Sequence, residues 1–257
     1  MLFVLSPAKT LDFTSPPEVE ATRPAFHKDT AELAAVARKL TAADLRRLMD
    51  ISETLAALNV ERFQSFDPKC REGVPAAFAF AGDVYAGLRA RDLGASALDY
   101  VQGHVRILSG LYGLLRPFDC IQPYRLEMGV RLQTARGATL YDFWGDRISK
   151  ALNKAAEGQT DRTLVNLASQ EYFGAVDARA LKLPLLACTF KEEKEGRARV
   201  LAFFAKKARG EMARFAAEQR VDRREGLKAF TGMGYGFRSD LSSDREYVFT
   251  RDQPTPA

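Results

Sequence analysis

Residues 106–129 of the chain read RILSGLYGLLRPFDCIQPYRLEMG. A turn with two glycines interrupts an apolar stretch, and a cluster with Tyr124, Arg125 and Glu127 follows directly after a proline. Apolar packing does not require Tyr-Arg-Leu-Glu at that place, and glycines near arginines let a backbone come close to an anion. The segment therefore predicts a binding site, and one that contacts phosphate.

The glycine turn in this segment resembles a helix-hairpin-helix, in which backbone N–H groups bind DNA phosphate without reading bases. The usual pattern has one residue between the glycines, whereas here Leu111 and Tyr112 separate them. A glycine that ends a helix explains Gly110 as well. The phosphate-binding residues predicted here are Ser109, Gly110, Gly113 and Arg116.

A second basic segment is predicted to form a helix over residues 206–219. Two lysines stand at its expected N-terminus, where free N–H groups and the helix dipole favour anions. With 100° per residue, the lysines, a glycine and an arginine fall within about a 100° arc. A solvated basic face is the alternative interpretation. The phosphate-binding residues predicted here are Lys206, Lys207, Arg209, Gly210 and Arg214.

Polar side chains also follow two predicted strands, where they commonly line pockets. Together with the Tyr-Arg-Glu cluster they mix cations, carboxylates and hydroxyls, which suits an enzyme site with a general base and an anion clamp. Two simpler interpretations stay open: Arg125 and Glu127 form a local ion pair, and Ser169 only caps a helix. The candidate catalytic residues are Lys9, Tyr124, Arg125, Glu127, Asn166, Ser169 and Glu171.

The composition is typical of a soluble globular protein, with 46% hydrophobic and 28% charged residues among 257. No stretch approaches the roughly 18 apolar residues that span a membrane, and the apolar start is too short for a secretory signal. We therefore expect a cytoplasmic protein without a membrane partner. The net charge is +5, yet residues 181–230 alone hold 13 Lys and Arg against 7 Asp and Glu, a net charge of +6. Such a patch favours nucleic-acid or nucleotide binding.

Cysteine and histidine are sparse. The three cysteines, Cys70, Cys120 and Cys188, form no C-x-x-C pair, and His27 and His104 are the only histidines. We expect no disulfide framework, no metal site and no cofactor, and interpret each cysteine as a small buried side chain. For Cys120, beside the Tyr-Arg-Glu cluster, a role as a thiol sensor is the alternative.

Periodicity and capping signals predict a mixed α/β (α+β) fold with one domain over residues 1–257. Thr41 with Asp44 indicates a capping box, and Ser52 caps the following helix. Strands are expected at 1–5, 163–167, 183–190, 196–204, 227–231 and 246–250. Helices are expected at 31–40, 42–49, 53–66, 82–91, 95–108, 146–156 and 206–219. An irregular connection is expected at 12–28 and a frayed tail at 252–257.

Taken together, six motifs resemble the bacterial YaaA peroxide stress family, in order from residue 1 to about residue 251. They are SPAKTL (6–11), LSGLYGLLRP (108–117), YRLEMG (124–129), FWG (143–145), NLASQEY (166–172) and FAKKARG (204–210). The resemblance implies a single mixed α/β domain of unusual topology, with a basic cleft and a helix-hairpin-helix-like element. It also implies a response to hydrogen peroxide, a limit on unincorporated iron and on oxidative damage, and binding to double-stranded DNA.

Three hypotheses follow. The first is a peroxide-stress protein that binds double-stranded DNA through phosphate, without strong sequence specificity. The second is an enzyme that acts on a phosphorylated or carboxylated small molecule such as a nucleotide, and it fails if the candidate residues are scattered. The third, direct iron binding, rests only on the implied iron phenotype.

Overall fold

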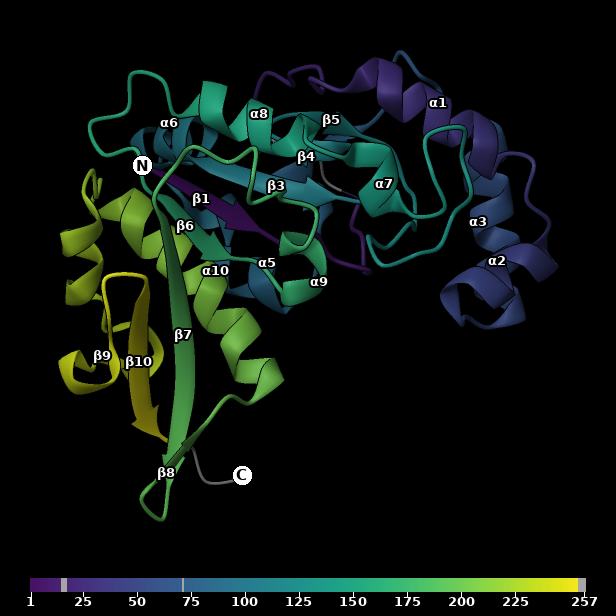
Figure 1. Ribbon diagram of the computed structural model, residues 1–257. Coiled ribbons are helices and arrows are strands. Elements are labelled where there is room, and N and C mark those ends of the chain that lie inside the picture. Colours follow the sequence, from purple (N-terminus) through teal and green to yellow (C-terminus); the bar gives the residue numbers. More distant parts are fainter. Residues whose placement is uncertain (15–17, 71, 254–257) are drawn as a thin grey trace.

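Figure 1 shows a computed structural model of the protein, which describes residues 1–14, 18–70 and 72–253. Part of the connection predicted at 12–28 and most of the tail predicted at 252–257 lie outside the described residues. The fold is mixed α/β, as the sequence predicts.

Strands in the described part of the chain form one mostly parallel sheet and a small separate pair. The sheet contains β1 (Leu2–Leu5), β3 (Val105–Ser109), β4 (Gly113–Leu115), β6 (Leu164–Leu167), β7 (Leu185–Lys194), β8 (Arg197–Arg199), β9 (Gly236–Phe237) and β10 (Glu246–Asp252). Its order is β4-β3-β1-β6-β7-β10-β9, with β8 paired to β7. The separate pair is β2 (Val74–Pro75) and β5 (Cys120–Ile121).

The predicted first strand is the centre of this sheet. All four residues of β1 are buried, and the strand runs parallel to β3 on one side and to β6 on the other. A parallel strand that is covered on both faces has a continuous apolar sequence, which is why LFVL forms it. Because the three strands run the same way, their carboxyl ends meet at one edge of the sheet.

Helices surround the sheet. They are α1 (His27–Ala37), α2 (Ala42–Met49), α3 (Glu53–Ser65), α4 (Ala76–Ala79), α5 (Asp83–Leu88), α6 (Ala95–His104), α7 (Leu140–Trp144), α8 (Arg147–Ala155), α9 (Gln170–Phe173) and α10 (Ala202–Glu218). The long helix α10 packs along α5 and α6 and against β7. The α2–α3 pair lies at the other end of the molecule from β9 and β10 (Figure 1).

Local capping signals are confirmed. Thr41 and Asp44 form the predicted capping box at the start of α2. Ser52 Oγ accepts a hydrogen bond from the Leu55 N–H at 3.3 Å and so caps α3. The capping expected from Asp29 or Thr30 is absent, since α1 begins earlier, after Phe26.

Several element boundaries differ from the prediction. The helix predicted at 95–108 ends at His104, and the residues after it form β3, because Val105 pairs with Phe3 of β1. The strand predicted at 196–204 stops at Arg199, and the helix after it begins at Ala202. Residues predicted as a strand at 227–231 belong largely to a 3-10 segment, Arg224–Ala229.

The cysteine prediction is wrong for two of the three residues. Cys70 and Cys120, 50 positions apart, form a disulfide, and both are only half-buried. Cys188 is free and buried, as predicted. Burial raises the pKa of the Cys188 thiol to about 12.

Candidate functional site

Two serines tie together the carboxyl ends of β1 and β6. The Ser169 N–H donates to Ser6 Oγ at 2.9 Å, and the Ser6 hydroxyl donates to Ser169 Oγ at 3.3 Å. Ser169 also caps α9 by accepting from the Tyr172 N–H, as one of its two interpretations predicts. Ligands of α/β proteins bind outside the carboxyl ends of parallel strands, and this edge is therefore the candidate site.

Three charged side chains meet at this edge. Glu127 Oε2 lies 2.9 Å from Lys9 Nζ, and Glu127 Oε1 accepts from Arg125 at 2.9 Å from Nη2 and 3.1 Å from Nε. The Lys9 side chain is 62% exposed, whereas those of Arg125 and Glu127 are 16% and 18% exposed. The trio carries a net charge of about +1, and Lys9 is the member that is free to swing toward solvent.

Two tyrosines form the wall behind these charges. The Tyr124 hydroxyl lies 2.6 Å from Ser109 Oγ, at the end of β3, and Tyr124 is buried. Burial raises the pKa of Tyr124, and burial together with the nearby Tyr124 raises the pKa of Tyr172. Both phenols are therefore protonated at neutral pH, so they can donate hydrogen bonds but cannot act as bases.

The other candidate catalytic residues stabilise the turn after β6. Asn166 Oδ1 accepts from the Ala168 N–H at 2.9 Å. Glu171 Oε1 accepts from the Gly129 N–H at 3.1 Å, two residues beyond Glu127. These contacts join the turn after β6 to the segment that carries the charged trio.

The seven candidate catalytic residues thus converge on one edge of the sheet. Four of them line a pocket with a volume of ≈ 10 Å³, which has room for about one water molecule. A larger ligand would enter only if Lys9 moved. The pocket is lined by Pro7, Ala8, Lys9, Tyr124, Arg125, Leu126, Glu127 and Tyr172.

The glycine turn is a β-hairpin rather than a helix-hairpin-helix. Ser109 pairs with Gly113 at the end of the antiparallel strands β3 and β4. A Cβ on Gly110 would collide with the Leu126 carbonyl, and Gly113, at φ +69°, would place a Cβ 2.6 Å from Trp144. The turn is buried, so the prediction that Ser109, Gly110 and Gly113 contact phosphate is corrected: close packing requires these glycines.

Arg116 is also engaged within the protein. Its Nε and Nη2 lie 3.1 and 2.8 Å from Asp119 Oδ1, and Nη2 donates to the Arg23 carbonyl at 3.1 Å. The Asp119 side chain is 1% exposed. The guanidinium therefore balances a buried carboxylate.

The basic helix begins four residues earlier than predicted, so its lysines lie in the second turn of α10 and not at the N-terminus. Gly210 is buried against α5, where a Cβ would collide with the Val84 carbonyl. Arg214 donates to the carbonyls of Leu88 and Arg89 and pairs with Glu218 at 2.7 Å. Gly210 and Arg214 therefore belong to the packing between α10 and α5.

Five cations of β8 and α10 lie within thirteen residues of each other in the chain. In residues 1–14, 18–70 and 72–253, no carboxylate forms a salt bridge with any of them, and several arginines elsewhere, such as Arg106 and Arg245, have none either. Burial lowers the pKa of Arg209, which is half-buried without an acidic partner. A guanidinium in that position gains most from an added anion. The five are Arg197, Arg199, Lys206, Lys207 and Arg209.

Sequence reasoning missed three neighbours of the site: Ser6, Tyr172 and the disulfide pair. The pairing of β1 with β6 would have located Ser6, because it follows a strand as Ser169 does. Tyr172 lies one residue beyond the predicted Glu171. A link between cysteines 50 positions apart has no local sequence signal.

Neither a metal-ligand cluster nor a membrane-spanning helix occurs in the described residues. No cluster of three or more His, Cys, Asp or Glu in them has the arrangement needed to hold a metal ion. No helix in the same residues has both the length and the apolar character to cross a bilayer.

Comparison with known proteins gives consistent matches. Residues 1–241 match the family described as "Peroxide stress protein YaaA". A UPF0246 protein of Phenylobacterium zucineum is 63% identical over 257 residues, covering 100% of this chain and 97% of that protein. Another, from Caulobacter vibrioides, is 63% identical over 255 residues, with 99% and 100% covered. A third, from Dinoroseobacter shibae, is 53% identical over 259 residues, with 100% and 97% covered.

Proposed function

The chain belongs to the YaaA peroxide stress protein family, and from that premise we propose that it binds double-stranded DNA in the cytoplasm without strong sequence specificity. Bound in this way, it limits oxidative damage to DNA during peroxide stress.

One observation carries this proposal: the five unpaired cations of β8 and α10. Backbone phosphates are recognised by Lys and Arg whose charge is not already neutralised within the protein. Lys206 is exposed, and Lys207 and Arg209 are half-buried on the same helix. A phosphate oxygen that approaches Arg209 gives its guanidinium a partner. This interaction offsets the free energy that the partial burial of the guanidinium costs in the unbound protein.

The test is the binding of a short fluorescent duplex across a salt series. The double change Lys206→Ala with Lys207→Ala should weaken binding to unrelated sequences alike. Because each phosphate contact contributes about 0.9 to the slope of log affinity against log salt, the slope should fall by about 2. A salt-independent affinity would contradict the proposal.

A matched control removes the same charge elsewhere. Lys150 and Arg179 are exposed and paired, with Asp146 at 2.6 Å and with Asp177 at 3.3 Å. The double change Lys150→Ala with Arg179→Ala should leave the salt slope unchanged. If both double variants lose affinity equally, only the overall charge matters and the assignment to α10 fails.

We also propose that the protein limits unincorporated iron without holding iron itself. The described residues contain no ligand cluster for a metal. Chelatable iron in peroxide-treated cells, measured by electron paramagnetic resonance, should be lower with the wild-type protein than without it. Retention of stoichiometric iron by the purified protein through gel filtration would favour direct binding.

The converging cluster favours a second candidate, an enzyme for a phosphorylated or carboxylated small molecule such as a nucleotide. Lys9 and Arg125 would hold the anion, Glu127 would act as the base, and the protonated Tyr124 and Tyr172 would donate hydrogen bonds. Calorimetry with nucleoside phosphates should then detect binding that Arg125→Gln weakens at least about tenfold. The Lys206/Lys207 variant should retain this binding, which separates the two functions.

A further inference from the structure

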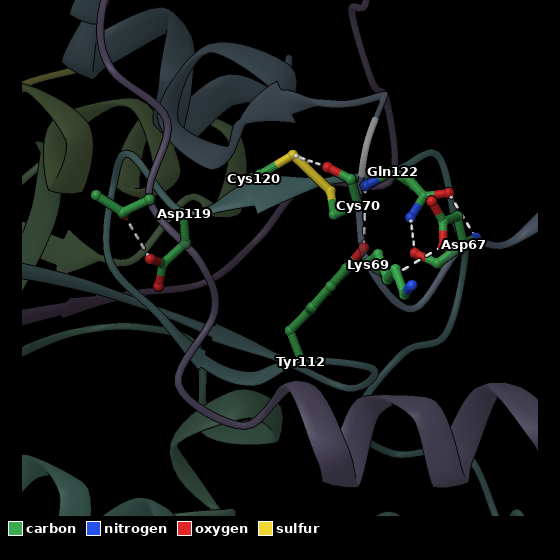
Figure 2. The surroundings of a disulfide bond; sticks show 8 residues. Asp67, Lys69, Cys70, Tyr112, Asp119, Cys120 and Gln122 are labelled. Atoms are coloured by element: carbon green, nitrogen blue, oxygen red, sulfur yellow. Dashed lines mark hydrogen bonds between the residues drawn. A yellow bond between two sulfur atoms is a disulfide. The ribbon is translucent and has the colours of Figure 1, made fainter.

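The disulfide joins the loop after α3 to β5, close to the place where β2 pairs with β5. Figure 2 shows Cys70, in the loop after α3, bonded to Cys120 of β5. The loop lies against the segment after β5: the Asp67 N–H donates to Gln122 Oε1 at 2.9 Å, and Gln122 Nε2 donates to the Asp67 carbonyl at 2.6 Å. These two hydrogen bonds, here called the Asp67–Gln122 clasp, hold the cysteines face to face.

The backbone around the cysteines is shaped for this bond. Cys70 has φ +48°, a conformation that side-chain-bearing residues rarely adopt unless their surroundings impose it. A Cβ on Gly73 would lie 2.7 Å from Cys120 Sγ and 2.9 Å from Cys70 Sγ. The absence of a side chain at Gly73 therefore makes room for both sulfur atoms.

The pair is partly exposed and lies next to a pocket. Gly73, Val74 and Gln122 line a pocket of ≈ 730 Å³ next to it, and both cysteines are half-buried. Cys188 is the opposite case, because it is buried and its thiol has a raised pKa. Thiols react with peroxide as thiolates, so burial and a raised pKa both slow the reaction of Cys188, whereas the pair is partly exposed.

Hydrogen bonds connect the pair to the candidate site. The Gln122 N–H donates to the Tyr112 hydroxyl at 3.0 Å, and the Tyr112 N–H donates to Ser109 Oγ at 3.0 Å. Ser109 in turn contacts the Tyr124 hydroxyl at 2.6 Å. Gln122, Tyr112, Ser109 and Tyr124 therefore form a continuous series of hydrogen-bonded residues from the Asp67–Gln122 clasp to the candidate site.

We propose that Cys70 and Cys120 are a redox site that hydrogen peroxide oxidises, and that the bond controls the order of the segment from Gln122 to Tyr124. One thiolate attacks peroxide: an S–O bond forms, the O–O bond breaks, and the leaving hydroxide takes a proton to become water. The second thiol then attacks the sulfenic sulfur, an S–S bond forms, and the second oxygen leaves as water. Two thiols lose two electrons and two protons, and one peroxide becomes two waters. A dithiol reductant returns the disulfide to two thiols and is itself oxidised to a disulfide.

Thiol accounting in the full-length protein tests the chemistry. The protein is reduced, freed of reductant, treated with hydrogen peroxide, alkylated and analysed by peptide mass spectrometry. We expect Cys70 and Cys120 to lose alkylation at least tenfold faster than Cys188. In Cys120→Ser, Cys70 should be trapped by dimedone as a sulfenic acid, and Cys188→Ser should behave as wild type. Equal rates for all three cysteines would overturn the redox site.

Hydrogen exchange tests the structural consequence and needs no DNA. Reduction should speed amide exchange at Tyr112 and Gln122 at least tenfold, while β1 stays unchanged. Unchanged exchange in the reduced protein would overturn the link to Tyr124. Neither thiol alkylation nor hydrogen exchange requires DNA. A failure of the redox proposal can therefore be distinguished from a failure of the proposed DNA binding.

Discussion

Gly87 of α5 and Gly210 of α10 lie against each other where the two helices cross. A Cβ on Gly210 would sit 2.7 Å from the Leu88 nitrogen, and one on Gly87 would sit 2.8 Å from the Glu211 nitrogen and 3.1 Å from the Gly210 Cα. Backbone atoms cannot move aside as a flexible side chain can. The crossing therefore has no room for a side chain at position 87 or at position 210.

The first prediction concerns this crossing. Gly210→Ala should destabilise the protein by about 1–3 kcal/mol or more, because it overpacks a backbone contact. Chemical denaturation with urea measures the change in the free energy of unfolding. Gly103→Ala is the matched control: Gly103 lies inside α6 with open space around its Cβ position. There the change should stabilise by about 1 kcal/mol. Equal effects of both substitutions would contradict the packing argument.

The second prediction concerns the hydroxyl pair behind the site. Ser109→Ala removes the acceptor of the Tyr112 N–H and the partner of Tyr124. Because it leaves buried polar groups without partners, it should cost about 1–3 kcal/mol in unfolding free energy. Tyr124→Phe removes only one hydroxyl and should cost less. A double-mutant cycle should give non-additive losses, whereas additive losses would show that the two hydroxyls do not interact.

The third prediction concerns pH. Burial lowers the pKa of His104, which stacks on Tyr100 at 4.0 Å and whose Nδ1 lies 2.9 Å from the Met1 carbonyl. Between the lowered pKa of the folded protein and the value near 6.5 of the unfolded chain, His104 is therefore protonated in the unfolded chain but neutral in the folded protein. The stability that neutral His104 contributes is present above pH 6.5 and is lost as pH falls toward the folded pKa.

Unfolding free energies of wild type and His104→Gln, measured from pH 8 to pH 5, check this. The difference between the two proteins should shrink as the pH falls below about 6.5. A difference that stays constant over this range would mean that folding does not shift the pKa of His104, and one that grows at low pH would mean that the shift has the opposite sign.

The fourth prediction concerns a buried ion pair in the C-terminal part. Arg251 Nε lies 3.3 Å from Glu192 Oε1, with side-chain exposures of 10% and 1%. The guanidinium lies between the rings of Phe204 and Tyr235, at 4.7 and 4.6 Å. Glu192→Gln leaves this cation buried without a counter-charge and should cost about 3–5 kcal/mol.

Glu193→Gln is the control for that change. Glu193 is the next residue on β7, and it pairs with Arg238 at the surface, where solvent screens the charges. Its thermal unfolding midpoint should differ little from that of wild type, while Glu192→Gln should unfold at a clearly lower temperature. Similar midpoints for the two variants would mean that the burial of Arg251 has no energetic consequence.

How much of this fold the sequence could predict depends on the range of the interactions. The capping box of Thr41 and Asp44 acts over three residues, so it could be recognised from the sequence alone. β3 could not, because Val105 is held in a strand by Phe3, about a hundred residues away. The apolar residues before Lys206 suit a strand as well as a helix, and only packing against α5 and β7 decides between them.

The same limit applies to the candidate site. Lys9, Arg125 and Glu127 were identified because their residue types are unusual after an apolar segment, and they do meet. Gly110 and Gly210 were predicted to let a phosphate come close, yet backbone packing uses them. Sequence shows that a glycine is needed but not whether a ligand or a neighbouring helix comes close. Cys120 was considered as a thiol sensor, but its pairing with Cys70 had no sequence signal, since the two cysteines meet only in the folded protein.

The central place of β1 also has a consequence for synthesis. This strand is made before both of its neighbours, and one of them, β6, ends only at Leu167. At about 5–20 residues per second, the apolar LFVL segment therefore waits many seconds for its partner. During that time its exposed edges are open to other chains. The centre of the sheet therefore closes only after β6 has been made.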